Sequence, residues 1–355
     1  MRTPYIVGPP VRLPTDFFGR AAQTRQFYDL LAGPQVQCVS VLGLRRAGKT
    51  SFLQHVAHPE VMAGYLSDAG RYLMVSVDVS ACKTPADFYT RVGRRLLAAL
   101  SPQTAQQEPP GDAYGIESLL YDLADRRVVL LLDEFDQLRA ADFGADFMTE
   151  LRALAGVWDY ELGFVTASYW DLYRLGNFVG LPVTSPFYNI FHPTAIYLSG
   201  LSPAELDDLV RVPARHVGIV AEDEDVAYVR RIAGSLPFFV QATAAIWLAD
   251  KLDNHRGGER EVTARLVSEM GPYFEQWWRN FSDVERDALA TIAAEKPVER
   301  LPYSEAEVAA AVQRLRHYGI LAATGGLWID GLLFQSWLRE MVAVAPAAPG
   351  PHRRV

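Results

Sequence analysis

The sequence feature that most constrains the fold runs from Gly43 to Thr50, where GLRRAGKT fits the pattern GxxxxGK[ST]. A run of apolar residues ends directly before it, and a segment of helical periodicity starts directly after it at Ser51. A strand, a glycine-rich loop and a helix in this order place successive backbone N–H groups around a phosphate at the positive end of the helix. The pattern therefore predicts a phosphate-binding loop, because a chance match would not explain the strand before it.

The residue types in this loop suit a nucleoside triphosphate. The glycines allow the backbone to curl around the β-phosphate, and Lys49 is placed to neutralise the β and γ oxygens. The hydroxyl of Thr50 can bind a magnesium ion. We therefore expect a magnesium-binding carboxylate on a neighbouring strand.

Short apolar runs rich in β-branched residues alternate with segments of helical period. This alternation indicates βαβ units and a parallel sheet that is buried on both faces, so an α/β domain is predicted from about residue 16 to 200. The expected strands are 38–42, 72–79, 128–132, 162–167 and 195–198.

Two acids follow the run 128–132, at the edge where an open α/β sheet binds ligands. Asp133 suits the magnesium site, and Glu134, which faces differently, suits a general base that polarises the attacking water. A plain acidic turn is the alternative, and the phosphate loop upstream argues against it. Asp136 is ambiguous, and a solvated or helix-capping role is favoured for it.

A hydroxyl follows the run 162–167. We expect Ser168, rather than Thr166, to contact the γ-phosphate or the attacking water, since Thr166 is expected to point into the sheet. A strand-end hydroxyl without a catalytic role is the alternative.

From Ser202 on, the periodicity is helical only. Ser202, Pro203 and Glu205 have the pattern of a helix start, and Ser304 with Glu307 repeats it. Two glycines at 325–326 separate short apolar runs after these helices, which predicts a hairpin and a winged helix. The expected division is a nucleotide-binding core at 1–200, a helical unit at 201–272, a winged helix at 273–343 and a disordered tail at 344–355.

Charge and cysteine content exclude several classes of protein. The net charge of −8 gives no general affinity for nucleic acid. Cys38 and Cys82 lack zinc-ligand spacing, and we expect both to be reduced and buried in a cytoplasmic protein. Prolines and glycines interrupt the uncharged stretches, so no membrane segment and no signal peptide is predicted.

Together these motifs resemble the AAA+ superfamily and, within it, the prokaryotic STAND regulatory ATPases that carry a winged helix. The stretch from Phe17 to Arg20 resembles the box that lies against adenine and ribose, and residues 45–51 resemble a double-arginine Walker A loop. Residues 129–136 resemble Walker B, Ser168 resembles sensor 1, and residues 234–238 resemble the GxP motif of a helical lid. The nucleotide-binding residues implied by the resemblance are Phe18, Gly19, Arg20, Gly43, Arg45, Arg46, Ala47, Gly48, Lys49, Thr50, Ser51 and Pro237.

The resemblance implies a P-loop NTPase core of AAA+ type, with a helical lid at 201–272 and a C-terminal winged helix. It also implies a regulatory switch that binds ATP or ADP with Mg²⁺, hydrolyses ATP slowly, and acts through a protein partner, either an effector or another copy. Two departures stand out. Ala21 and Ala22 follow the box where acids are frequent in the family, and Ile329 occupies the place of a histidine that senses the β-phosphate in some members.

The resemblance extends to the Orc/Cdc6-type replication initiators, which makes DNA binding the alternative function. The segment 274–344 carries ten acidic and seven basic side chains, although Arg314, Arg316 and His317 gather on one expected helix. Since an acidic surface binds a phosphate backbone poorly, a protein-interaction role is favoured.

Overall fold

The computed structural model describes residues 3–140, 142–253, 258–323 and 325–344. The chain forms two compact units. The core unit consists of Pro10–Leu44 and Gly48–Leu198. The C-terminal unit starts at Ser199 and also includes the N-terminal segment up to Pro9 and Arg45–Ala47, which lie inside the phosphate loop in sequence.

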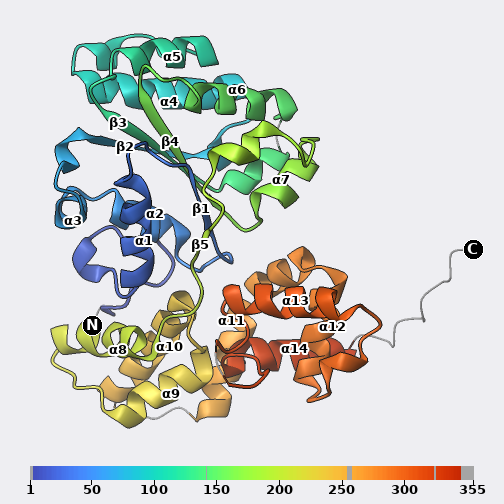
Figure 1. The fold of residues 1–355 in the computed structure, drawn as a ribbon. Coiled ribbons are helices and arrows are strands. Elements are labelled where there is room, and N and C mark those ends of the chain that lie inside the picture. Colours follow the sequence, from blue (N-terminus) through green and yellow to red (C-terminus); the bar gives the residue numbers. More distant parts are fainter. Residues whose placement is uncertain (1–2, 141, 254–257, 324, 345–355) are drawn as a thin grey trace, which may run out of the picture. The chain divides into compact units, whose positions relative to one another are not determined.

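The core unit contains a parallel sheet with the strand order β2-β3-β4-β1-β5 (Figure 1). This confirms the predicted α/β class, and each expected strand is present within two residues at either end. The strands are β1 (Val39–Leu42), β2 (Tyr72–Asp78), β3 (Arg127–Asp133), β4 (Glu161–Ser168) and β5 (Ile196–Tyr197). Because all strands are parallel, their carboxyl ends lie at one edge of the sheet.

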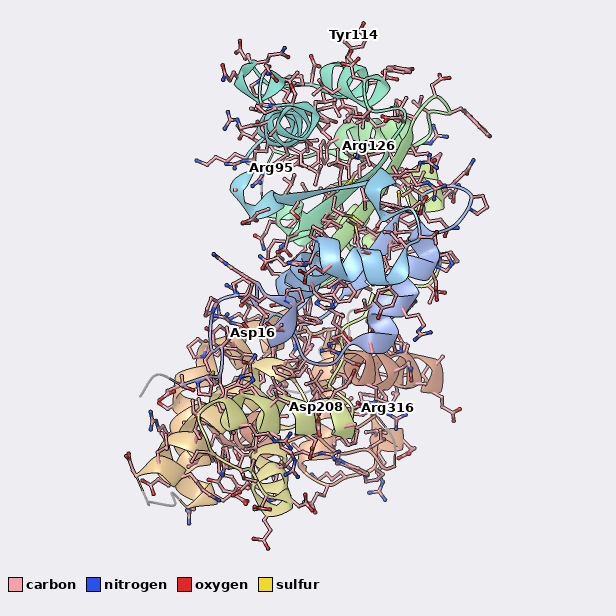
Figure 2. All side chains as sticks on the ribbon, turned by 90° about the vertical axis from the view of Figure 1, so that its left-hand side faces the viewer. Asp16, Arg95, Tyr114, Arg126, Asp208 and Arg316 are labelled. Carbon is pink, nitrogen blue, oxygen red and sulfur yellow. The ribbon has the colours of Figure 1, made fainter. Side chains whose placement is uncertain are left out.

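Both faces of the sheet are covered, which explains why its strands are apolar runs. Leu130 and Leu132 pack with side chains of α4 (Pro85–Leu100), α5 (Ala113–Tyr121) and α6 (Ala145–Ala155). On the other side, α2 (Lys49–Val56) contacts β3 and β4, and α1 (Ala21–Leu31) contacts β5. In Figure 2, Tyr114 points outward from α5, and its side chain is 78 % exposed.

The remaining elements complete the two units. In the core unit, the other α-helices are α3 (Pro59–Tyr65) and α7 (Leu172–Phe178). Those of the C-terminal unit are α8 (Pro203–His216), α9 (Asp223–Ala233), α10 (Pro237–Leu252), α11 (Glu259–Asn280), α12 (Asp283–Ala293), α13 (Glu305–His317) and α14 (Leu332–Val344). Short 3-10 turns are η1 (Pro14–Asp16), η2 (Ala69–Arg71), η3 (Val79–Ala81), η4 (Thr104–Gln106), η5 (Phe135–Ala140), η6 (Pro186–Ile190) and η7 (Val298–Arg300).

Cys38 and Cys82 are free and buried, as expected. Burial raises the pKa of the Cys38 thiol to about 12, so this side chain is an inert part of the core. Within the described ranges, no helix combines the length and the apolar character that crossing a bilayer requires.

Serine caps start several helices of the C-terminal unit. Ser202 with Glu205 and Ser304 with Glu307 form the expected capping boxes, in which each side chain satisfies the backbone N–H of the other residue. Helix α11 continues without interruption through residues 272–273, where the boundary between lid and winged helix was expected. An antiparallel bridge joins Leu321 to Ile329 after α13. The winged helix remains a prediction, and the tail from residue 345 on lies outside the described residues.

A close approach of backbones joins α9 to the residues before α14. Gly234 ends α9 with φ 70° and ψ −146°, a conformation that is nearly exclusive to glycine. A Cβ atom on Gly234 would lie 2.6 Å from the carbonyl oxygen of Asp330. Gly331 is just as constrained, because its Cβ would lie 2.3 Å from the backbone nitrogen of Gly234. Only residues without side chains fit at this junction.

We expect Gly234→Ala to lower the free energy of unfolding of the C-terminal unit by about 2–4 kcal/mol, because the strained φ and the backbone clash add. Gly271→Ala is the matched control in the same unit. Gly271 lies inside α11 and a Cβ there would meet its nearest side-chain atom at 4.0 Å, so alanine should stabilise the helix by up to about 1 kcal/mol. Chemical denaturation measures both, and equal stability of the two variants would contradict the prediction.

Candidate nucleotide-binding site

The phosphate loop lies where the sequence placed it, between β1 and α2. The backbone N–H of Gly43 donates to the carbonyl oxygen of Ser168 at 3.2 Å, so the start of the loop is fixed to the end of β4. Gly48 has φ 94° and is the N-cap of α2, and Arg46 has φ 72°. Left-handed residues turn successive N–H groups toward one side, which forms a concave anion site at a helix N-terminus.

Lys49 is the first residue of α2, and its side chain is 7 % exposed. Its Nζ donates hydrogen bonds to the carbonyl oxygens of Gly43 at 3.0 Å and Leu44 at 3.2 Å. The ammonium group is therefore held over the loop by the loop's own backbone. Phosphate oxygens entering the loop would meet a charge that is already in place.

The two ends of the predicted metal site meet directly. The hydroxyl of Thr50 donates to Oδ2 of Asp133 at 2.6 Å, and the backbone N–H of Glu134 donates to Oδ1 of Asp133 at 3.0 Å. Burial raises the pKa of the Asp133 carboxyl, although the Thr50 hydroxyl and the Lys49 charge oppose that shift. A partly buried carboxylate next to a hydroxyl supplies the oxygen donors that Mg²⁺ prefers, and phosphates and waters would complete the shell.

Glu134 has a strained backbone. Its φ is 51°, and a left-handed conformation is uncommon for a residue with a long side chain. Among the described residues, the non-glycine residues with positive φ are Arg20, Arg46, Glu134 and Glu295. Strain of this kind concentrates at functional sites, and the first three of these residues were predicted from the sequence to bind nucleotide or catalyse hydrolysis.

Ser168, Thr166 and Asp136, which lie near this edge of the sheet, form hydrogen bonds within the protein. The hydroxyl of Ser168 is fully buried and donates to the carbonyl oxygen of Trp170 at 2.7 Å. Thr166 is also fully buried and points into the sheet toward the hydroxyl of Ser40, as expected. The solvated role favoured for Asp136 is wrong, because its side chain is buried and accepts from the backbone N–H of Tyr169.

The predicted adenine box precedes α1. Gly19 and Arg20 both have positive φ, and Arg20 is buried although it carries a charge. The ring of Phe17 stacks on His55 in the last turn of α2, with centroids 4.1 Å apart. This contact connects the box to the helix that starts at the phosphate loop.

Asp78 is an acid at the same edge of the sheet that was not predicted from the sequence. This residue ends β2 and pairs in register with Asp133, and its charge contributes to the raised pKa of the Asp133 carboxyl. The available signal was an acid that ends an apolar strand, the same signal that identified Asp133. Its carboxylate accepts from the backbone N–H and the hydroxyl of Ser80, so it also caps the turn that follows β2.

The remaining predicted residues belong to the C-terminal unit. Pro237 is the first residue of α10, as the missing N–H of proline favours. Ser235 donates two hydrogen bonds to Oδ2 of Asp330, through its backbone N–H at 2.9 Å and through its hydroxyl. Ile329 is buried, and its apolar side chain cannot donate a hydrogen bond to a phosphate.

Comparisons with solved structures show the fold. The Walker-type ATPase PABY2304 of Pyrococcus abyssi has a TM-score of 0.61 at 14 % identity, with 93 % of this chain and 98 % of that chain covered. The ORC2 protein of Aeropyrum pernix, solved as ADPNP–ADP complexes, has a TM-score of 0.51 at 13 % identity over 95 % and 97 %. At identities this low, the structural similarity shows only that this chain shares the P-loop ATPase fold.

In sequence, no curated protein matches this chain significantly. The profile of the family described as Novel STAND NTPase 2 matches residues 29–298, which is more than half of the chain and includes the phosphate loop, Asp133 and Glu134. The chain therefore belongs to the Novel STAND NTPase 2 family.

Proposed function

We propose that this protein binds ATP with Mg²⁺, hydrolyses it slowly, and works as a regulatory switch through a protein partner. The observation that carries the proposal is the meeting of Thr50 and Asp133 at 2.6 Å, beside the buried ammonium of Lys49. These side chains are far apart in sequence. Their convergence at the carboxyl edge of the sheet supports a triphosphate site rather than separate structural roles.

The residues at the carboxyl edge of the sheet have separate roles in the proposed hydrolysis. The loop N–H groups bind the β-phosphate, and Lys49 exchanges its bonds to loop carbonyls for bonds to the β and γ oxygens. Thr50 and Asp133 would hold Mg²⁺, which supplies charge neutralisation on the phosphate oxygens. Glu134 accepts the proton of the attacking water as that water adds to the γ-phosphorus, while the bond from the γ-phosphorus to the β–γ bridging oxygen breaks and ADP leaves.

A protein partner suits the charge of the C-terminal unit better than DNA does. The basic side chain of Arg314 on α13 is paired with the buried carboxylate of Glu285 at 2.8 Å, so it is engaged within the protein. Neutralising duplex phosphates needs unpaired cations, and this pairing removes one of the few on α13. DNA binding would instead appear as salt-sensitive duplex affinity in a gel shift at two salt concentrations.

We expect Lys49→Ala to weaken ATP binding at least about a hundredfold, or ~2.8 kcal/mol, because a buried charge facing the phosphates is lost. Calorimetric titration measures this loss. Lys83→Ala, at an exposed lysine of the same unit, is the control and should bind ATP like the wild type. Undiminished affinity in Lys49→Ala would remove the proposed site.

Glu134→Gln should keep ATP affinity and lower the rate of phosphate release by about 10²–10⁴-fold, because glutamine cannot accept the proton of the attacking water. Glu295→Gln is a closely matched control, since Glu295 also has a left-handed backbone, with φ 56°, but lies in the C-terminal unit. Wild-type turnover in Glu134→Gln would assign the general base elsewhere.

Asp133→Asn tests the metal site and gives a pH dependence. Since the pKa of Asp133 is raised by folding, the folded state holds its proton more tightly, and the free energy of unfolding falls as pH rises through that pKa. Asparagine carries no charge to bury, so the Asp133→Asn variant should have a higher Tm than the wild type at neutral pH, and the difference should shrink as the pH falls through the raised pKa toward the usual aspartate value of 3.8.

The same substitution should abolish the gain in ATP affinity that magnesium gives the wild type. Asp208→Asn removes an exposed carboxylate on α8 and should change neither property (Figure 2). A magnesium effect that survives in Asp133→Asn would place the metal on other ligands.

A further inference from the structure

The tip of the phosphate loop has tertiary contacts of its own. Arg45–Ala47 lie between Leu44 and Gly48 in sequence, but they pack as part of the C-terminal unit. The loop backbone thus leaves the core unit for three residues and returns to it at the N-cap of α2. Contacts made by these residues therefore constrain the loop independently of the sheet.

The guanidinium of Arg46 lies against a pair of aromatic rings that contact each other edge to face, with centroids 5.5 Å apart. Its Cζ is 4.8 Å from the ring centroid of Phe238 on α10 and 4.8 Å from that of Tyr273 on α11. Its Nη2 donates to the hydroxyl of Tyr273 at 2.7 Å, and its Nη1 donates to the carbonyl oxygen of Gly8 at 2.7 Å. Two cation–π contacts and two charge-assisted hydrogen bonds fix this side chain.

Neighbouring residues of α11 hold Arg45 in a similar way. The indole Nε1 of Trp277 donates to the carbonyl oxygen of Arg45 at 3.2 Å, and Arg45 donates to the amide oxygen of Gln276 at 3.0 Å. Tyr273, Gln276 and Trp277 are three and four residues apart, so they share one face of the helix. Trp277 is 2 % exposed and packs on Phe274, which makes this face a rigid support.

These contacts account for an arginine at a position where glycine would be easier. Arg46 has φ 72°, which a non-glycine residue adopts only when its surroundings enforce it. Both terminal nitrogens of the guanidinium have hydrogen-bond partners, and two aromatic rings lie against the group. The side chain is therefore used to anchor the loop, and it would have to leave these partners to reach a phosphate.

We propose that Phe238 and Tyr273 are positioning residues for nucleotide binding, which hold Arg46, and with it the phosphate loop, in the left-handed conformation that receives the phosphates. This inference rests on the proposed ATP site and adds residues outside the nucleotide-binding core to it.

The test uses the full chain and calorimetric titration with ATP and magnesium. Tyr273→Ala and Phe238→Ala should each weaken ATP binding about 3–10-fold, the range expected for losing a cation–π contact with or without a hydrogen bond. Tyr273→Phe keeps the ring and should lie between Tyr273→Ala and the wild type. Glu275→Ala, at an exposed residue of the same helix, is the matched control and should bind like the wild type.

A double-mutant cycle separates anchoring from a merely structural role. Arg46→Gly frees the backbone but removes the anchor, so Tyr273→Ala added to Arg46→Gly should cause less than about a twofold further loss. Losses that multiply would mean that the rings act independently of Arg46, and wild-type affinity in both ring variants would also overturn the inference. Thermal unfolding checks that each variant is folded, and Tyr273→Phe covers the case in which the alanine variant is not.

Hydrogen exchange of the loop amides, measured without nucleotide, tests the anchoring of the loop separately from ATP binding. Backbone amides of the loop at 43–48 should exchange faster in Tyr273→Ala and Tyr273→Phe than in the wild type and in Glu275→Ala. If the wild type binds no ATP while the loop still loosens in these variants, the proposed function fails and the anchor stands. If ATP binds and the loop exchanges equally in all variants, the anchor fails alone.

Discussion

The hydrogen bond between Thr50 and Asp133 connects the first turn of α2 to the last residue of β3. These elements meet although β1 and β3 are not neighbours, because β4 lies between them and all three strands run in the same direction. The parallel sheet thus places a loop, an acid and a helix N-terminus at one edge. This arrangement partly buries the Asp133 carboxylate, which destabilises its charged form and raises its pKa. A bound divalent cation would offset this unfavourable free energy.

Backbone strain at this edge follows from the same arrangement. Gly48 supplies one left-handed position of the phosphate loop without cost, but Arg46 and Glu134 adopt left-handed conformations as residues with long side chains. Specific contacts hold each of these residues. Arg46 packs against the rings of Phe238 and Tyr273, and the backbone N–H of Glu134 donates to the Asp133 carboxylate. Strain of this kind prepares a site for its ligand before the ligand arrives.

Where α9 meets the residues before α14, the C-terminal unit combines tight backbone packing with side-chain hydrogen bonds. The backbones at Gly234 and Gly331 approach so closely that neither position has room for a Cβ atom. The Asp330 carboxylate accepts a hydrogen bond from Ser235 at the same junction. Asp330 therefore joins two segments of its own unit.

The sequence alone determined the class of sheet, all its strands and the ends of the phosphate loop, because these depend on local pattern: apolar runs, capping serines and a glycine motif. It also placed Lys49, Thr50, Asp133 and Glu134 at one edge, since parallel strands share their carboxyl edge. Only the tertiary structure assigned Arg45–Ala47 to the C-terminal unit and put Tyr273 beside Arg46. Contacts between residues more than two hundred positions apart depend on how helices pack, and no local pattern in the chain encodes that.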